Sequence, residues 1–149
     1  MVSEVADLYA LLQSVHESVD QMVQDLTDEQ WLTKPLPNFN NVTSVIDHIT
    51  RVEKKFFSAL AGESLDIDTQ APFKAESWDL NAVHHDWSAS LPYAAEVLEN
   101  VKEEELSQLG LHLRVGELNK RQLIAYAIAH AAHHRGQIPL IKKLLIKSE

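Results

Sequence analysis

Apolar residues recur at steps of three and four positions over long stretches of this chain, and this spacing is its strongest constraint on the fold. A helix face repeats at that interval, whereas a strand face repeats every second residue. The four glycines in 149 residues supply few of the turns that a multi-stranded protein needs. An all-α fold is therefore predicted, and its first helix spans about residues 4–25 with the stripe Val5, Leu8, Leu12, Val15, Val19, Met22 and Leu26.

A second helix is predicted to open near Thr43 or Ser44, with Ser44 and Asp47 as its capping pair, and to end at Gly62. Residues 62–78 lack helical periodicity. This connection is longer than a direct turn into an antiparallel neighbour requires, so it is expected to cross the bundle.

The remaining periodic stretches predict two more helices. Residues 80–101 form the third, and Pro92 either kinks it, which we favour, or marks a beginning nearer Ser90. The fourth covers residues 119–147 and is expected to bend near Pro139. Residues 106–116 alternate like a strand, but a lone strand has no pairing partner, so a loop is predicted there.

Composition limits the function. A chain of 149 residues is expected to form a single domain, 1–149, and without cysteine it has no thiolate ligands or disulfides. The formal charge of −9 argues against nucleic acid as a partner. No long apolar run predicts a membrane span, and the N-terminus lacks the pattern of a signal peptide, so a cytoplasmic location is expected.

Histidines are the candidate functional residues. On a wheel of about 100° per residue, His130 and His134 lie within about 20° of Leu123 on the apolar face of the fourth helix, whereas His133 lies about 80° away. An i, i+4 pair stacks two imidazoles so that both can reach one metal ion. The spacing alone leaves metal binding and a hydrogen-bonded packing role equally open.

His48, at the border of the apolar stripe of the second helix, is the candidate third ligand. A single half-buried histidine is more often a packing residue, so His48 gains its interest from the pair. The other histidines have no comparable partner spacing and are interpreted as surface or packing residues: His16, His84, His85 and His112.

The run His130-Ala-Ala-His133-His134-Arg135-Gly136-Gln137-Ile138, with Asp47-His48-Ile49 some eighty residues earlier, resembles the DinB/YfiT-like superfamily of metalloenzymes, the DinB family. The resemblance covers the whole chain. It implies a four-helix bundle with a crossover between the second and third helices, often assembled as a homodimer. It also implies a metal bound by His48, His130 and His134.

In relatives the metal is zinc, nickel, iron or manganese, and for this chain zinc or nickel is expected first. Some relatives transfer low-molecular-weight thiols to electrophiles. We therefore expect a metal-dependent enzyme that activates a water or such a thiol against a small-molecule substrate. The alternatives are a non-catalytic metal or small-ligand binding bundle and a plain interaction bundle. Asp47, Tyr126 and Gln137 are candidate supporting residues behind the ligands, although each also suits a surface or capping role.

Overall fold

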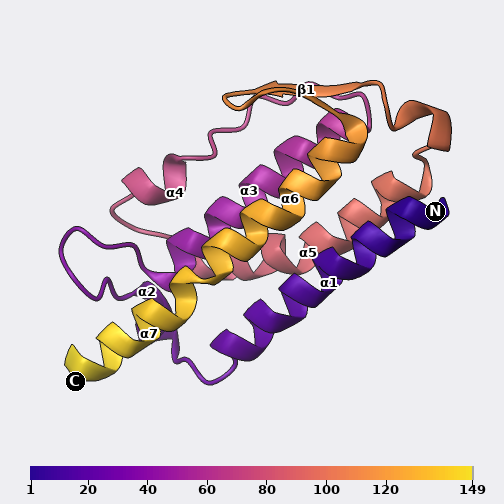
Figure 1. Ribbon diagram of the computed structural model, residues 1–149. Coiled ribbons are helices and arrows are strands. Elements are labelled where there is room, and N and C mark those ends of the chain that lie inside the picture. Colours follow the sequence, from indigo (N-terminus) through magenta and orange to yellow (C-terminus); the bar gives the residue numbers. More distant parts are fainter. Residues whose placement is uncertain (149) are drawn as a thin grey trace.

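The computed structural model describes residues 1–148 and confirms a four-helix bundle (Figure 1). Its long helices are α1 (Ser3–Val23), α3 (Val42–Leu60), α5 (Leu80–Glu99) and α6 (Lys120–Arg135), and α7 (Gln137–Ser148) extends the last of them. The connections contain five short elements: α2 (Asp28–Leu32), α4 (Ala71–Lys74), the 3-10 turn η1 (Glu103–Glu105), β1 (Leu109–Leu113) and β2 (Gly116–Asn119). Within residues 1–148, no helix is both long and apolar enough for a membrane span.

The predicted crossover is present between α3 and α5. These helices pack against each other and run in the same direction in Figure 1, so residues 61–79 return along the length of the bundle before α5 begins. The short helix α4 lies within this return and packs on α3. The helix α3 also packs against α6, and α1 packs against α5 and α6. The crossover therefore places residues 61–79 over the side of α3 on which His48 lies.

The central helix α3 is buried around most of its circumference because α4, α5 and α6 all pack on it. Valine, isoleucine and phenylalanine side chains fill its apolar positions. Between them α3 buries several polar side chains, which need partners inside the protein. Those relevant to function are Asp47, His48 and Glu53.

The helices α2, α3 and α6 each begin after a residue whose side chain caps the N-terminus, and for α3 this residue differs from the predicted one. Thr27 and Gln30 form a capping box on α2, and Asn119 forms one with Gln122 on α6. The predicted pairing of Ser44 with Asp47 is wrong. Asn41 caps α3 instead, because its side chain accepts the Ser44 N–H at 2.7 Å. The helix therefore begins at Val42, one or two residues before the predicted start.

Two predicted irregularities are resolved by the structure. The helix α5 runs continuously from Leu80 through Pro92, so a beginning near Ser90 is wrong, while the kink stays a prediction. The bend of the last helix is a break: α6 ends at Arg135, Gly136 follows, and α7 begins at Gln137. Pro139 is the third residue of α7, within the first turn, where a backbone N–H has no acceptor inside the helix, so the missing N–H of proline costs α7 no hydrogen bond.

The predicted loop at 106–116 is also wrong. Residues Leu109–Leu113 form β1, which pairs antiparallel with β2 through a two-residue turn. Gly116 closes the turn with a φ of +118°, a conformation that glycine adopts without strain. The partner strand has only four residues, too few to show an alternating pattern of its own.

Candidate metal centre

Three histidines from two helices meet between α3 and α6. His48 comes from the first half of α3, and His130 and His134 occupy successive turns of α6. One ring nitrogen of each lies within 4.8 Å of the corresponding nitrogen of the other two. The i, i+4 pair and the third imidazole predicted from the sequence are thus brought together, and we call these three residues the histidine cluster.

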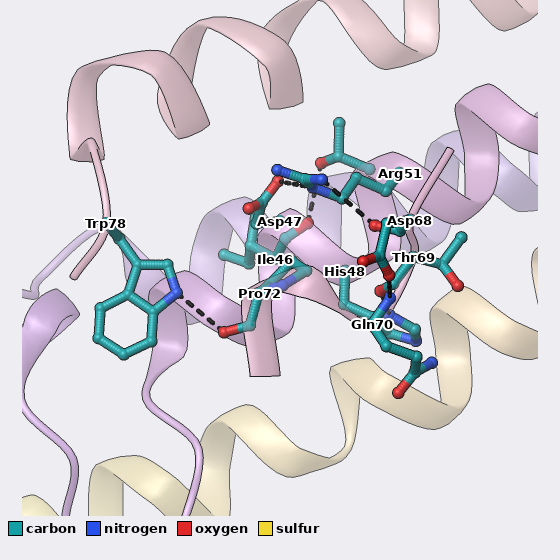
Figure 2. Close-up of polar contacts among 10 residues, drawn as sticks. Ile46, Asp47, His48, Arg51, Asp68, Thr69, Gln70, Pro72 and Trp78 are labelled. Atoms are coloured by element: carbon teal, nitrogen blue, oxygen red, sulfur yellow. Dashed lines mark hydrogen bonds and ion pairs between the residues drawn. The ribbon is translucent and has the colours of Figure 1, made fainter. Parts of the chain in front are cut away.

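The orientation of His48 is fixed by a backbone carbonyl. Its Nδ1 lies 2.6 Å from the carbonyl oxygen of Thr69, an atom that can only accept, so Nδ1 carries the proton (Figure 2). In a neutral imidazole the other nitrogen then has a free lone pair. That nitrogen, Nε2, lies 3.0 Å from Nε2 of His130, so the lone pair of His48 faces the centre of the cluster.

The orientation of His134 is fixed in the same manner. Its Nδ1 donates to Oε1 of Gln137 at 2.9 Å, which leaves Nε2 without a proton in the neutral ring. Gln137 is the first residue of α7, so the break after α6 places this acceptor beside the ring. The contact predicted for Gln137 on the basis of sequence proximity is present.

His130 has no such acceptor. Its Nδ1 is the one buried side-chain nitrogen or oxygen within the described chain that has no hydrogen-bond partner. Its Nε2 could donate a proton to His48, but one proton cannot satisfy the lone pairs of both His48 and His134. With protein groups alone, the cluster therefore leaves ring nitrogens unpaired, which is costly in a partly buried setting.

Electrostatics hold all three rings in the neutral form. Burial lowers the pKa of His48 and of His134, and the hydrogen bonds to Thr69 and Gln137 oppose that effect. For His130, burial is the largest cause, and repulsion from His134, His48 and His133 in their protonated forms adds to it, so its pKa falls to about 3. Neutral imidazole is the form that binds metal.

The donor set fits a late divalent cation. Zinc lies about 2.0–2.1 Å from an imidazole nitrogen, and two such ligands of a tetrahedral ion are about 3.3 Å apart. The 3.0 Å between the Nε2 atoms of His48 and His130, and the 4.8 Å limit for the whole set, bracket that value. An ion would accept all three lone pairs at once, which no protein group here does.

The other two predicted supporting residues do not contact the histidines. The Asp47 carboxylate binds Nε of Arg51 at 3.1 Å, and its charge raises the pKa of His48 only as the smallest of three influences. The Tyr126 ring lies 5.9 Å from that of Phe56, and within residues 1–148 Tyr126 has no hydrogen bond to the cluster.

Two further residues of the site were missed. The Thr69 carbonyl holds His48, and the Phe73 ring covers that imidazole with 4.5 Å between centroids. Both lie in the return from α3 to α5, which has no periodic signal and whose backbone carbonyls carry no sequence signature. A cavity of about 220 Å³, which no histidine of the cluster lines, lies among α3, α4 and the start of α5, and its lining includes Asp47 and Pro72.

A second buried histidine lies in the core. Nε2 of His16 donates to the Glu53 carboxylate at 2.8 Å, and the hydroxyl of Ser90 donates to the same carboxylate at 2.9 Å. The His16 ring stacks on Trp87 with 4.0 Å between centroids. We call these residues the Glu53 cluster. These contacts show that His16 is a packing residue, one of the two roles predicted for it. His84 is half-buried, and His85 and His112 are exposed, as expected for surface or packing residues.

Comparisons with known proteins agree with this architecture. The sequence profile of the DinB family matches residues 1–145. No curated protein matches the chain significantly. A conserved protein from Enterococcus faecalis is 20% identical with a TM-score of 0.75, and the match covers 94% of this chain and 95% of that one. YfiT from Bacillus subtilis is 15% identical with a TM-score of 0.73, and the match covers 97% of this chain and 89% of that one. YfiT is described as a probable metal-dependent hydrolase with an unusual four-helix bundle topology.

Proposed function

The chain belongs to the DinB family, and from that membership we propose that it binds one divalent metal ion through the Nε2 atoms of His48, His130 and His134. The main observation behind the proposal is that hydrogen bonds fix the tautomers of His48 and His134. The Thr69 carbonyl and the Gln137 side chain each accept a hydrogen bond from Nδ1 of one ring, so the Nε2 atoms of His48 and His134 keep free lone pairs, and one ring nitrogen from each of the three histidines lies within 4.8 Å of the others.

The ligand set narrows the choice of ion. Three neutral imidazoles suit late divalent metals, whereas calcium and magnesium prefer oxygen ligands. Zinc or nickel is the first expectation, and iron or manganese is the alternative. No carboxylate belongs to the cluster within residues 1–148, so all three protein ligands are uncharged nitrogens.

We further propose that the site is catalytic. Three protein ligands leave a coordination position open, and an ion bound there lowers the pKa of a coordinated water or low-molecular-weight thiol. Because the chain has no cysteine, a thiol nucleophile arrives as a cosubstrate. The reaction is hydrolysis or thiol S-transfer on a small molecule. The description of YfiT as a probable metal-dependent hydrolase favours the first branch.

The chain's own residues orient the ligands and limit the access of water. Gln137 and the Thr69 carbonyl hold two imidazoles, and Phe73 covers His48. Acceptors behind metal-bound imidazoles fix the ring orientation and raise the basicity of the ligand.

Metal analysis of the purified protein tests the proposal. We expect one zinc, nickel, iron or manganese ion per chain in the wild type and His133→Ala, and less than a tenth of that in His134→Ala. His133 is the control because it neighbours His134 in sequence and its ring contacts that of His134, with 4.9 Å between centroids, but it is exposed and does not belong to the histidine cluster. Equal metal contents in all three proteins, or no metal even after incubation with zinc and nickel, would contradict metal binding by this cluster.

A second measurement separates catalysis from a metal that only joins α3 to α6. Metal at about 100 times its dissociation constant stabilises the folded chain by about 2.7 kcal/mol in either case. Only an enzyme also turns over an ester or a thiol with an electrophile, and loses that turnover in His134→Ala. Stabilisation without turnover would favour the non-catalytic binding bundle.

The homodimer implied by the family resemblance stays a prediction. The mass of the protein in solution, measured by light scattering with and without metal, tests it.

A further inference from the structure

Thr69 lies in a segment without regular structure, yet its carbonyl fixes a metal ligand. Residues 61–70 connect α3 to α4, and Thr69 contacts His48 from outside both helices. A carbonyl in such a segment is a precise acceptor only if its neighbours hold it in place. The contacts on either side of Thr69 therefore decide how firmly His48 is oriented.

The preceding residue is held by an arginine of α3. Nη1 of Arg51 donates to the Asp68 carbonyl at 3.2 Å, and the Asp68 side chain accepts the Gln70 N–H at 3.0 Å, across Thr69. Arg51 is itself fixed, because its Nε donates to the Asp47 carboxylate at 3.1 Å. Figure 2 shows these contacts on one side of α3.

The contacts form a closed circuit. It begins at Asp47, passes through Arg51 to Asp68 and Thr69, and returns to His48, which follows Asp47 on the same helix. Only a guanidinium suits the position of Arg51 in this circuit. Its planar group presents Nε to the Asp47 carboxylate and Nη1 to the Asp68 carbonyl in fixed geometry. A lysine ammonium is a single point charge and cannot reproduce both contacts.

We propose that Arg51 is a positioning residue of the metal centre. By tethering the Asp68 carbonyl it keeps the Thr69 carbonyl on Nδ1 of His48, and so keeps the lone pair of Nε2 directed at the ion. The effect on metal affinity rests on the proposed function, whereas the effect on the His48 tautomer does not require a metal.

The test compares Arg51→Met and Arg51→Lys with the control Arg121→Met. Arg121 makes an ion pair with Glu4 through Nε at 2.6 Å, on an exposed part of the surface, so its loss removes a similar interaction elsewhere. Zinc affinity is measured by calorimetric titration of each protein. We expect about a 10- to 100-fold loss in both Arg51 variants, as is usual for residues behind metal ligands, and less than a twofold change in the control.

The second readout is the tautomer of His48 in the metal-free protein, taken from its ring-nitrogen chemical shifts. We expect a proton on Nδ1 in the wild type and in Arg121→Met, and a mixture of both tautomers in Arg51→Met and Arg51→Lys. Unchanged affinity in both Arg51 variants overturns the proposal. A lost affinity with an unchanged tautomer also overturns it, because Arg51 would then act through charge or stability. If the wild type binds no metal but the tautomer shifts, the positioning role holds and the proposed function fails.

Discussion

The two buried histidine clusters of this bundle satisfy their polar atoms in different ways. In the Glu53 cluster one carboxylate accepts hydrogen bonds from His16 and Ser90, and Trp87 covers the ring. In the histidine cluster no carboxylate is present, the rings face one another, and Nδ1 of His130 has no partner within the described residues. A buried histidine that has its acceptor contributes to the fold, whereas a group of neutral rings with unpaired lone pairs presents a set of donors that a cation would satisfy.

Removing the carboxylate should have the largest effect on stability. The Glu53→Ala variant leaves His16 and Ser90 without their acceptor in the core, so we expect the free energy of unfolding to fall by about 2–6 kcal/mol, since each unsatisfied buried donor costs about 1–3 kcal/mol. Urea denaturation in the presence of a chelator measures this loss.

The same variant tests whether the clusters are independent. Metal content per folded chain should stay at the wild-type value, because Glu53 does not belong to the histidine cluster. A Glu53→Ala protein that remains as stable as the wild type would show that the carboxylate is not needed to bury His16. Loss of metal from the folded variant would show that the two clusters act as one.

The acceptor behind His134 offers a smaller and more local change. Gln137→Leu removes the oxygen that holds Nδ1, and we expect about a tenfold loss of zinc affinity, equivalent to about 1.4 kcal/mol. Gln137→Glu keeps an acceptor at that position and should retain the affinity. Calorimetric titration distinguishes the two variants.

The control for this pair is Gln21→Leu, a substitution of an exposed glutamine on α1. An equal loss of affinity in Gln137→Leu and Gln137→Glu would mean that the acceptor does not matter. The role of Gln137 would then be confined to the start of α7.

The sequence predicts one cluster well and the other poorly, for a physical reason. His130 and His134 lie one turn apart on one helix, so the period of the helix brings them together before any tertiary contact is known. His16 and Glu53 lie 37 residues apart on different helices, and no spacing rule links them. The sequence therefore predicted only that His16 is a surface or packing residue, and it did not indicate the acceptor.

The same distinction explains the errors in the fold. Long periodic helices were predicted correctly because their apolar stripe extends over many turns. The strand β1 was interpreted as a loop because its partner, β2, is short and comes directly after the turn. The Thr69 carbonyl was missed because a backbone acceptor is available at every residue, and only the three-dimensional path of residues 61–79 selects this one.

The smallest effect expected from any single side chain is on the pH dependence of stability in the metal-free protein. All three rings of the histidine cluster have a lowered pKa in the folded state, to about 3 for His130, whereas an unfolded histidine titrates near pH 6.5. Below about pH 6.5 the unfolded chain therefore binds protons that the folded chain does not. Stability is fully present above that pH and falls as the pH is lowered toward the folded pKa values. Each ring contributes to the slope of the free energy of unfolding against pH. That contribution stays below the limiting value of about 1.4 kcal/mol per pH unit, because the rings are partly exposed.

Urea denaturation at pH 7.5, 6.5 and 5.5, with chelator present, compares the wild type with His130→Ala and with His112→Ala, which removes an exposed histidine from β1. His130→Ala lacks one of the groups with a lowered pKa, so its stability should fall less steeply with acid than that of the wild type. His112→Ala should retain the wild-type slope. If His130→Ala has the same slope as the wild type, His130 does not resist protonation in the folded protein. The cluster would then not hold the ring in its metal-binding form, and the contrast with the Glu53 cluster would be lost.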